Sequence, residues 1–193
     1  MTPPTTVTTL LADTLDDSLR ARIAPLRMMI FDVDGVLTDG RIIYLDDGSE
    51  MKQFHVRDGH GIRLLQRSGR VEVAFLTGRF CRAVEHRAAD LGVKRLYQNI
   101  KRKLETYEEI LAATGLQDHE VGFAGDDLID IPVMRRVGWA VAVPDGAPHV
   151  LPYAHYITMA RGGHGAGREV CELIMQVQGT WQAVTAGYFG ERA

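Results

Sequence analysis

Met28-Met29-Ile30-Phe31-Asp32-Val33-Asp34-Gly35-Val36-Leu37-Thr38-Asp39-Gly40 is the stretch of this 193-residue chain that decides its fold. Four apolar residues lead directly into two aspartates, and a glycine then allows the chain to turn. A short apolar run bounded by turn residues predicts a strand buried on both faces of a sheet. Asp32 and Asp34 then lie at the carboxyl edge, where open α/β sheets bind ligands.

The close spacing of Asp32 and Asp34 constrains their chemistry. Two carboxylates a few ångströms apart repel each other unless a cation joins them or one keeps a proton. A metal suits phosphate chemistry, whereas a shared proton suits acid–base catalysis. An EF-hand calcium loop is excluded, because Val36, Leu37 and Ile43 occupy positions that this loop fills with oxygen ligands and a glycine. A solvated acidic turn is the alternative without a function.

The composition is that of an ordinary globular protein, with 46% hydrophobic and 24% charged residues. A net charge of −3 argues weakly against nucleic acid as the main partner. No apolar stretch is long enough to span a membrane, so no membrane partner is expected. Cys81 and Cys171 form no metal-ligand pattern, and we therefore expect a reducing, cytoplasmic location.

The sequence is consistent with one domain between two short appendages. Residues 1–27 are expected to be an amino-terminal extension, residues 28–179 the main domain and residues 180–193 a carboxy-terminal tail. Residues 1–9 are rich in threonine and proline and are expected to be mobile. A short amphipathic helix, not a signal peptide, is expected next, since four apolar residues recur at helical spacing: Leu11, Leu15, Leu19 and Ile23.

Strand and helix patterns alternate after Gly40. Residues 41–45 and 50–55 predict a hairpin around an Asp-Asp-Gly-Ser turn. Buried strands are expected at residues 28–31, 71–76, 93–97, 120–124 and 139–143. Helices are expected at residues 58–65 (capped by Asp58), 81–91, 103–113 and 168–178, with a further one after Asp127. The alternation predicts an α/β fold: a doubly wound, mostly parallel sheet with a small β-hairpin flap and no cap domain.

Three of the expected strands end in polar sequence. These ends are Asp32 with Asp34, then Thr77-Gly78-Arg79, then Gly125-Asp126-Asp127. Parallel strands bring their carboxyl ends to one edge, so the three loops should converge there. Several carboxylates, a hydroxyl and nearby lysines at one edge are the parts needed for metal-assisted phosphoryl transfer.

These motifs, in this order, resemble the haloacid dehalogenase superfamily of phosphotransferases, whose core is Rossmann-like. Within that superfamily the chain resembles the small capless sugar-acid phosphatases, through residues 31–40, 56–59, 125–130 and 162–165. The likeness covers about residues 28–179. It departs in the amino-terminal extension, in the tail after Trp181, and at His164, where arginine is expected in close relatives.

The resemblance implies a role for each motif. Asp32 is the nucleophile that forms an aspartyl phosphate, and Asp34 protonates the leaving sugar oxygen and later activates water. Mg²⁺ is bound by the side chains of Asp32 and Asp126 and by the main-chain carbonyl of Asp34. Thr77, with the Gly78 amide, donates hydrogen bonds to the phosphoryl oxygens.

A lysine is expected to face the phosphate. Lys103 is preferred, because a helix begins directly after it, but Lys101 is an alternative. Asp127 and Asp130 are interpreted as carboxylates that start a helix and support the site, in preference to metal ligands.

An anionic sugar acid needs cations besides the lysine that faces the phosphate. Arginine is the expected residue, because it binds carboxylates in a bidentate manner. Arg57 and Arg79 follow the motifs directly and are the first candidates. Arg63 and Arg87 lie in expected helices, where a solvated helix face is an equally good interpretation. The candidate substrate-binding residues are His55, Val56, Arg57, Asp58, Gly59, Arg63, Gly78, Arg79 and Arg87.

The resemblance implies hydrolysis of an eight-carbon sugar-acid 8-phosphate for lipopolysaccharide precursor synthesis. A nine-carbon sugar-acid 9-phosphate is the alternative substrate, because both reactions need the same motifs. A receiver-like phospho-acceptor domain is a distant alternative, since a receiver has its acidic pair on the first strand and here Asp126-Asp127 follow the lysine.

Assembly of several subunits is also expected, and the resemblance implies a homotetramer. The apolar residues 42–45 would be exposed on a lone hairpin, and pairing of hairpins between subunits would bury them. The resemblance further implies that the glycine-rich residues 162–167, a flexible segment, reach the active site of a neighbouring subunit.

Overall fold

The computed structural model describes residues 11–190, which form one main sheet of parallel strands. The strands are β1 (Met28–Phe31), β4 (Glu72–Leu76), β5 (Arg95–Tyr97), β6 (Val121–Gly125), β7 (Trp139–Ala142) and β8 (Tyr156–Ile157). Their order across the sheet is β5-β4-β1-β6-β7-β8, and all neighbouring pairs are parallel. The predicted doubly wound α/β fold is confirmed.

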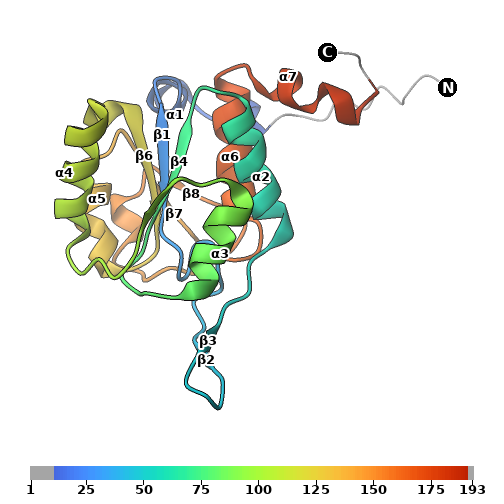
Figure 1. The fold of residues 1–193 in the computed structure, drawn as a ribbon. Helices are drawn as coiled ribbons and strands as arrows, with labels where there is room; N and C mark the ends of the chain where they lie inside the picture. The colour runs from blue at the N-terminus through green and yellow to red at the C-terminus, as the bar shows by residue number, and fades with distance from the viewer. Residues whose placement is uncertain (1–10, 191–193) are drawn as a thin grey trace.

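Helices cover both faces of this sheet (Figure 1). They are α1 (Asp17–Ile23), α2 (Val56–Arg67), α3 (Arg82–Leu91), α4 (Lys103–Thr114), α5 (Ile131–Met134), α6 (Ala166–Val177) and α7 (Trp181–Thr185). The buried side chains of α2, α3 and α6 pack on one face, and those of α4 and α5 pack on the other. The short α7 packs against α2 and α6.

β1 is the central element of the core. Met29 and Phe31 pack into the hydrophobic cluster on the α2 and α6 side, whereas Met28 and Ile30 pack into the cluster on the α4 side. All four are fully buried. A strand that is covered on both faces needs apolar residues at every position, which explains the uninterrupted Met-Met-Ile-Phe run.

The order of the strands determines where a site can form. The chain runs from β1 outward to β4 and β5, and then returns to β6 on the other side of β1. The connections after β1 and β6 therefore diverge, and this leaves a crevice at the carboxyl ends of the two strands. Asp32 follows β1, and Asp126 follows β6.

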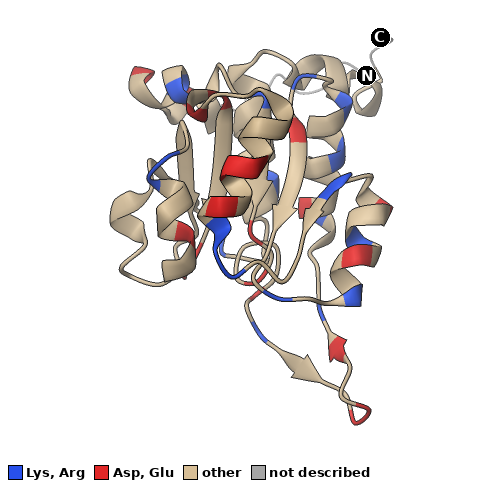
Figure 2. Cartoon of the chain, turned by 60° about the vertical axis from the view of Figure 1, so that its left-hand side comes forward, with Lys and Arg blue, Asp and Glu red and all other residues tan. Residues whose placement is uncertain are grey.

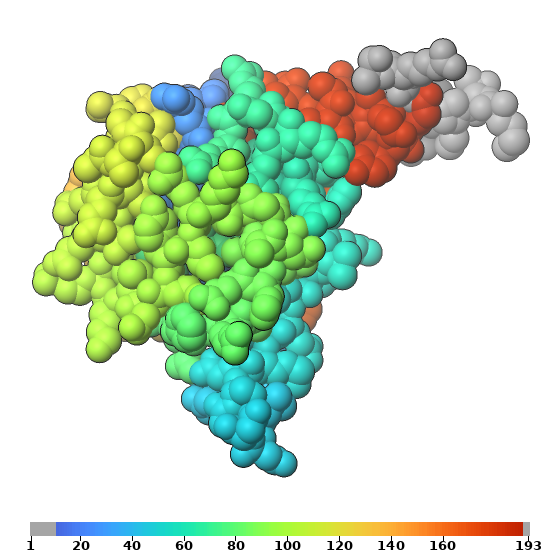
Figure 3. Space-filling view, in the orientation of Figure 1, coloured from blue at the N-terminus to red at the C-terminus, as the bar shows by residue number. Residues whose placement is uncertain are grey.

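The hairpin forms a separate sheet of two strands, β2 (Ile43–Tyr44) and β3 (Glu50–Met51). It projects from the carboxyl edge of the main sheet (Figures 1 and 3) and carries charges of both signs (Figure 2). The predicted hairpin is present, but its strands are only two residues long, shorter than the expected residues 41–45 and 50–55. Two isolated strands bury little surface, so few residues pair.

The amino-terminal part differs from the single expected helix. A 3-10 turn, Leu11–Thr14, precedes α1, and the two are separate because Asp16 caps α1. The Asp16 carboxylate accepts a hydrogen bond from Leu19 N–H at 2.8 Å. Ile23 is fully buried in the core. The mobility predicted for residues 1–9 concerns a part of the chain outside the described residues.

The sequence predicts that Asp58 caps its own helix, and the structure corrects this prediction. α2 begins at Val56, so Asp58 lies inside the first turn. The Asp58 carboxylate instead accepts a hydrogen bond at 2.8 Å from Arg168 N–H, at the start of α6. Burial raises the pKa of Asp58, although the hydrogen bond from Arg168 opposes this. Asp58 therefore connects two helices that are distant in sequence.

The glycine-rich residues 162–167 are not a flexible tail, which corrects the expectation from the sequence. Gly163 N–H donates to the carbonyl of Val36 at 2.9 Å. A Cβ atom at Gly162 would lie 1.7 Å from the carbonyl oxygen of Gly35. The segment is thus packed against the loop that follows β1 of its own chain. Between residues 11 and 190, no helix is long and apolar enough to cross a membrane.

Candidate active site

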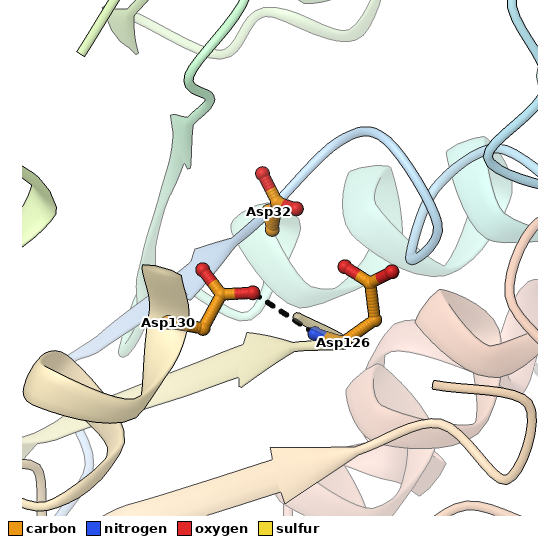
Figure 4. Close-up of side chains that lie close together, drawn as sticks. All are labelled: Asp32, Asp126 and Asp130. Carbon is orange, nitrogen blue, oxygen red and sulfur yellow. Dashed lines mark hydrogen bonds between the residues drawn. The ribbon is translucent and has the colours of Figure 1, made fainter. Parts of the chain in front are cut away.

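Three carboxylates meet in the crevice between β1 and β6 (Figure 4). Asp32 directly follows β1, Asp126 directly follows β6, and Asp130 ends the 3-10 turn Leu128–Asp130. Each side chain offers an oxygen, and these oxygens all lie within 4.8 Å of one another. Loops separated by most of the domain in sequence therefore form one acidic site, as the strand order requires.

A buried lysine neutralises part of this charge. Lys103 is the first residue of α4, and its side chain is 0% exposed. Its Nζ lies 2.8 Å from Asp32 Oδ1 and 2.6 Å from Asp130 Oδ1. Burial opposes the ammonium charge, but attraction to Asp32 and Asp130 outweighs it and raises the pKa of Lys103. Lys101, the alternative, is exposed.

Asp130 orients the other members of the site. Its Oδ1 accepts from Lys103, and its Oδ2 accepts from the backbone N–H groups of Asp126 (3.0 Å) and Asp127 (3.1 Å). Both oxygens are thus already hydrogen-bonded within the protein. Asp127 caps the 3-10 turn, because its Oδ1 accepts from Leu128 N–H at 2.7 Å. This geometry agrees with the supporting roles expected for Asp127 and Asp130.

The remaining carboxylates are electrostatically unfavourable without a cation. Burial, followed by repulsion from Asp130, raises the pKa of Asp32. Burial, followed by repulsion from Asp32, raises the pKa of Asp126. Asp126 Oδ1 is buried and has no hydrogen-bond partner among the described residues. An oxygen-only site with an unpartnered buried carboxylate oxygen fits a hard divalent cation such as Mg²⁺.

Gly35 creates the space for Asp126. Its φ is +94°, and a Cβ atom at this position would lie 2.0 Å from Asp126 Oδ2. Any other residue would therefore strain the backbone and displace the carboxylate. The glycine of the Asp-x-Asp-Gly motif is required by close packing as well as by the turn.

The Asp34 side chain contacts the hairpin and the loop after β4. Its Oδ1 forms an ion pair with Lys52, and its Oδ2 accepts a hydrogen bond from Thr77 Oγ1 at 3.2 Å. Thr77 is buried and also accepts from Arg79 N–H at 3.2 Å. Sequence reasoning missed Lys52. Glu50 and Lys52 alternate with exposed Met51, and this period of two was the available signal that both face the protein.

The candidate substrate-binding residues form two groups. Arg79 pairs with Glu50 of the hairpin, beside Asp34, and Gly78 lies between it and Thr77. The second group surrounds the start of α2, outside the carboxylate triad. It comprises His55, Val56, Arg57, Asp58, Gly59, Arg63 and Arg87.

Arg63 and Arg87 are held by neighbours in this second group. Both pair with Asp90, at 3.2 Å and 3.1 Å, and Arg87 also donates to the carbonyl of His55 at 3.3 Å. The Arg87 guanidinium lies over the Phe54 ring. The structure therefore does not pair either arginine with the carboxylates of the site. His55 Nδ1 and Asp58 Oδ2 are buried without hydrogen-bond partners among the described residues, so both atoms can still form hydrogen bonds with a ligand.

A family model for haloacid dehalogenase-like hydrolases matches residues 95–166. The chain is 48% identical to 3-deoxy-D-manno-octulosonate 8-phosphate phosphatase KdsC of Yersinia pestis, over 88% of this chain and 90% of that protein. The crystal structure of the Yersinia pestis phosphatase superposes with a TM-score of 0.85, covering 87% of this chain and 90% of that one.

The chain belongs to the KdsC family of haloacid dehalogenase-like hydrolases. It is a phosphoric monoester hydrolase, as predicted. The Moraxella catarrhalis member, 35% identical over 90% of this chain and 99% of that one, has a TM-score of 0.87. It was solved in complex with a magnesium ion, a phosphate ion and a KDO molecule. KdsC of Escherichia coli K12 is 46% identical over 82% of this chain and 84% of that protein.

Replacing Gly35 tests the packing of the site. Gly35→Ala should lower phosphatase activity by at least ~10²-fold, because its Cβ displaces Asp126. Gly48→Ala is the matched control, since φ is +80° there but nothing lies within 4 Å of the added Cβ. Both variants should lose about 1–2 kcal/mol of stability in denaturant unfolding from the left-handed backbone. Equal activities of the two variants would contradict the packing argument.

Proposed function

We propose that this enzyme is a magnesium-dependent phosphatase that hydrolyses 3-deoxy-D-manno-octulosonate 8-phosphate to 3-deoxy-D-manno-octulosonate and phosphate, in lipopolysaccharide precursor synthesis in the cytoplasm. The observation that carries the proposal is the buried contact of Lys103 with Asp32 at the β1–β6 crevice, in a chain 48% identical to a KdsC phosphatase. A strand-end aspartate offers a nucleophile, and a lysine beside it offers a countercharge for phosphate.

The reaction has two displacements in this proposal. A bond forms between an Asp32 carboxylate oxygen and phosphorus, while the bond from phosphorus to the sugar oxygen breaks. Asp34 gives its proton to the departing oxygen. Water then attacks phosphorus, Asp34 takes up a proton from that water, and phosphate leaves as the Asp32 carboxylate is restored. Lys103 fixes Asp32 and places positive charge beside the phosphoryl oxygens.

The residues that would hold Mg²⁺ are the carboxylates of Asp32 and Asp126 and the main-chain carbonyl of Asp34. The unpartnered Asp126 oxygen and the space left by Gly35 support this assignment. Asp130 is left out, because both of its oxygens already accept hydrogen bonds. When bound, the ion neutralises repulsion between the nucleophile and the phosphate and orients the phosphoryl group.

The sugar acid is assigned to the loops beside Asp34. Arg79 is partly exposed and lies in the loop next to the Asp34–Thr77 pair, where it can bind a carboxylate. Arg57, at the exposed start of α2, is the second candidate. A nine-carbon sugar-acid 9-phosphate is the alternative substrate, since the triad and Lys103 would serve both.

A panel of substrates tests this assignment. The purified protein with Mg²⁺ should show the highest kcat/KM for the eight-carbon sugar-acid 8-phosphate, above the nine-carbon 9-phosphate and a simple hexose 6-phosphate. Asp32→Asn should lower turnover of every substrate by several orders of magnitude, because it removes the nucleophile. A preference for the nine-carbon substrate would contradict the assigned substrate, and an active Asp32→Asn would contradict the mechanism.

Magnesium should stabilise the protein in a pH-dependent way. Asp32 and Asp126 have a higher pKa in the folded protein than in the unfolded chain. As the pH rises above their unfolded pKa, the stability of the metal-free protein falls, because the ionised carboxylates are unfavourable in the fold. Binding of Mg²⁺ requires the ionised forms, so protons compete at low pH.

The rise in melting temperature caused by Mg²⁺ should therefore be larger at about pH 8 than at about pH 6. Differential scanning fluorimetry with Mg²⁺ or EDTA measures it. Asp126→Asn should abolish the rise, whereas Asp46→Asn, at the exposed hairpin turn, should keep it. A rise that is larger at pH 6 would have the wrong sign for this site.

A homotetramer formed by the hairpins is part of the proposal. The hairpin exposes four apolar side chains, a surface that a second subunit would bury. These are Ile42 (43% exposed), Tyr44 (65%), Leu45 (47%) and Met51 (41%). Residues 162–167 pack on the loop after β1 of their own chain, and their reach into the active site of a neighbouring subunit stays a prediction of the assembly.

One charge on the hairpin should disrupt this assembly. Ile42→Asp should convert the tetramer to smaller species in multi-angle light scattering, because each interface would bury an unpaired charge. Ile157→Asp is the matched control, since this isoleucine is equally exposed (43%) but lies on β8. A wild-type monomer with full activity would rule out the assembly.

A further inference from the structure

Lys52 is a buried cation that the proposed mechanism does not use. It follows β3 in the hairpin, yet its side chain is only 2% exposed. Its Nζ forms an ion pair with Asp34 Oδ1 and lies 4.0 Å from Glu50 Oε2. A lysine on a projecting hairpin normally extends into water, because desolvation of an ammonium is costly. The ion pair with Asp34 offsets the free-energy cost of burying the Lys52 ammonium.

The Asp34 carboxylate is held on both sides by this arrangement. Lys52 contacts one oxygen, and Thr77 Oγ1 donates to the other at 3.2 Å. Thr77 belongs to the loop after β4, whereas Lys52 comes from the hairpin. Two partners from different elements leave the carboxylate little rotational freedom. If Lys52 were absent, Thr77 alone would orient Asp34.

A second ion pair fixes the hairpin in the position that allows this contact. Glu50 and Lys52 are two residues apart, so their side chains face the same way. Glu50 pairs with Arg79, which lies two residues after Thr77. The hairpin and the loop after β4 are therefore joined by charges of both signs beside Asp34. Since two-residue strands bury little, these pairs account for the docking of the hairpin.

We propose that Lys52 is a positioning residue for Asp34, an inference that rests on the proposed function. Lys52 holds the Asp34 carboxyl facing the sugar oxygen as the bond from phosphorus to that oxygen breaks. The protonated Asp34 carboxyl gives its proton to the sugar oxygen, and the Lys52 ammonium neutralises the carboxylate that this leaves, while Lys52 itself neither gains nor loses a proton. Its effect is therefore confined to substrates whose leaving oxygen needs a proton.

The dependence on leaving group tests this role. A sugar-acid phosphate expels a poor alkoxide leaving group, whereas p-nitrophenyl phosphate expels a stable phenolate that needs no proton. The kcat/KM value reports the steps up to departure of that group. Lys52→Met should lower it by about 10–100-fold for the sugar-acid phosphate and by less than about 3-fold for the aryl ester. Lys94→Met, an exposed lysine at the opposite edge of the sheet, is the control and should change neither.

A double-mutant cycle separates this proposal from the proposed function. Asp34→Asn should show the same selectivity with a larger loss, and adding Lys52→Met to it should cost less than about 3-fold more, since Lys52 acts through Asp34. If Asp34→Asn lowers both substrates equally, the proton-donor role fails and the Lys52 role fails with it. If Asp34→Asn is selective but Lys52→Met is not, only the Lys52 role is overturned.

Polar substitutions of Lys52 serve as controls for a loss of the fold. Lys52→Arg keeps the charge and should recover most of the sugar-acid kcat/KM, whereas Lys52→Gln should behave like Lys52→Met. Each variant should keep a melting temperature close to wild type. Equal activities of Lys52→Arg and Lys52→Gln toward the sugar-acid phosphate would overturn the proposal, as would a full additive loss in the Asp34→Asn background.

Discussion

The contact of Lys103 with Asp32 and Asp130 is the interaction on which the organisation of this protein depends. An ammonium with no exposed surface is stable because two carboxylates share it, and removal of Lys103 would leave both carboxylates buried without a countercharge. Its position at the start of α4 is fixed by that helix, while the aspartates are fixed by β1 and by the turn after β6. The charge cluster therefore joins three segments whose relative positions the hydrophobic layers determine. Electrostatics and packing specify the same geometry.

The two sides of the carboxyl edge serve different purposes. On the β6 side, Asp130 and the backbone of the turn hold the triad rigidly, with every oxygen of Asp130 in use. On the β4 side, Asp34 and Arg79 contact a hairpin attached mainly through ion pairs. Ion pairs can exchange partners with an anionic ligand more readily than a packed core can rearrange. Under the proposed function, the rigid side would bind the phosphoryl group, which is common to all phosphate esters, and the hairpin side would bind the part that varies between substrates.

The sequence was sufficient for the fold and for much of the site. A strand buried on both faces has an unmistakable apolar run, and the rule that parallel strands share a carboxyl edge brings Asp32 and Asp126 together. Local patterns could not reveal what depends on long-range packing. Lys52 has the local sequence of a solvated hairpin lysine, and only docking of the hairpin buries it. The interactions of Arg63 and Arg87 with Asp90 require the relative position of two helices, and the glycine-rich residues 162–167 look like a linker until their contact with Gly35 is visible. β8 is too short to show any periodicity.

The packing of Gly162 and Gly163 on the loop after β1 has a consequence for the order in which the protein matures. The aspartates that define the site are synthesised early, but the segment that covers their loop is nearly the last part of the domain to leave the ribosome. Contacts between residues so far apart in sequence form late, because closing such a long loop is entropically costly. A growing chain thus carries Asp32 and Asp34 through most of translation without the contact that packs against the loop after β1.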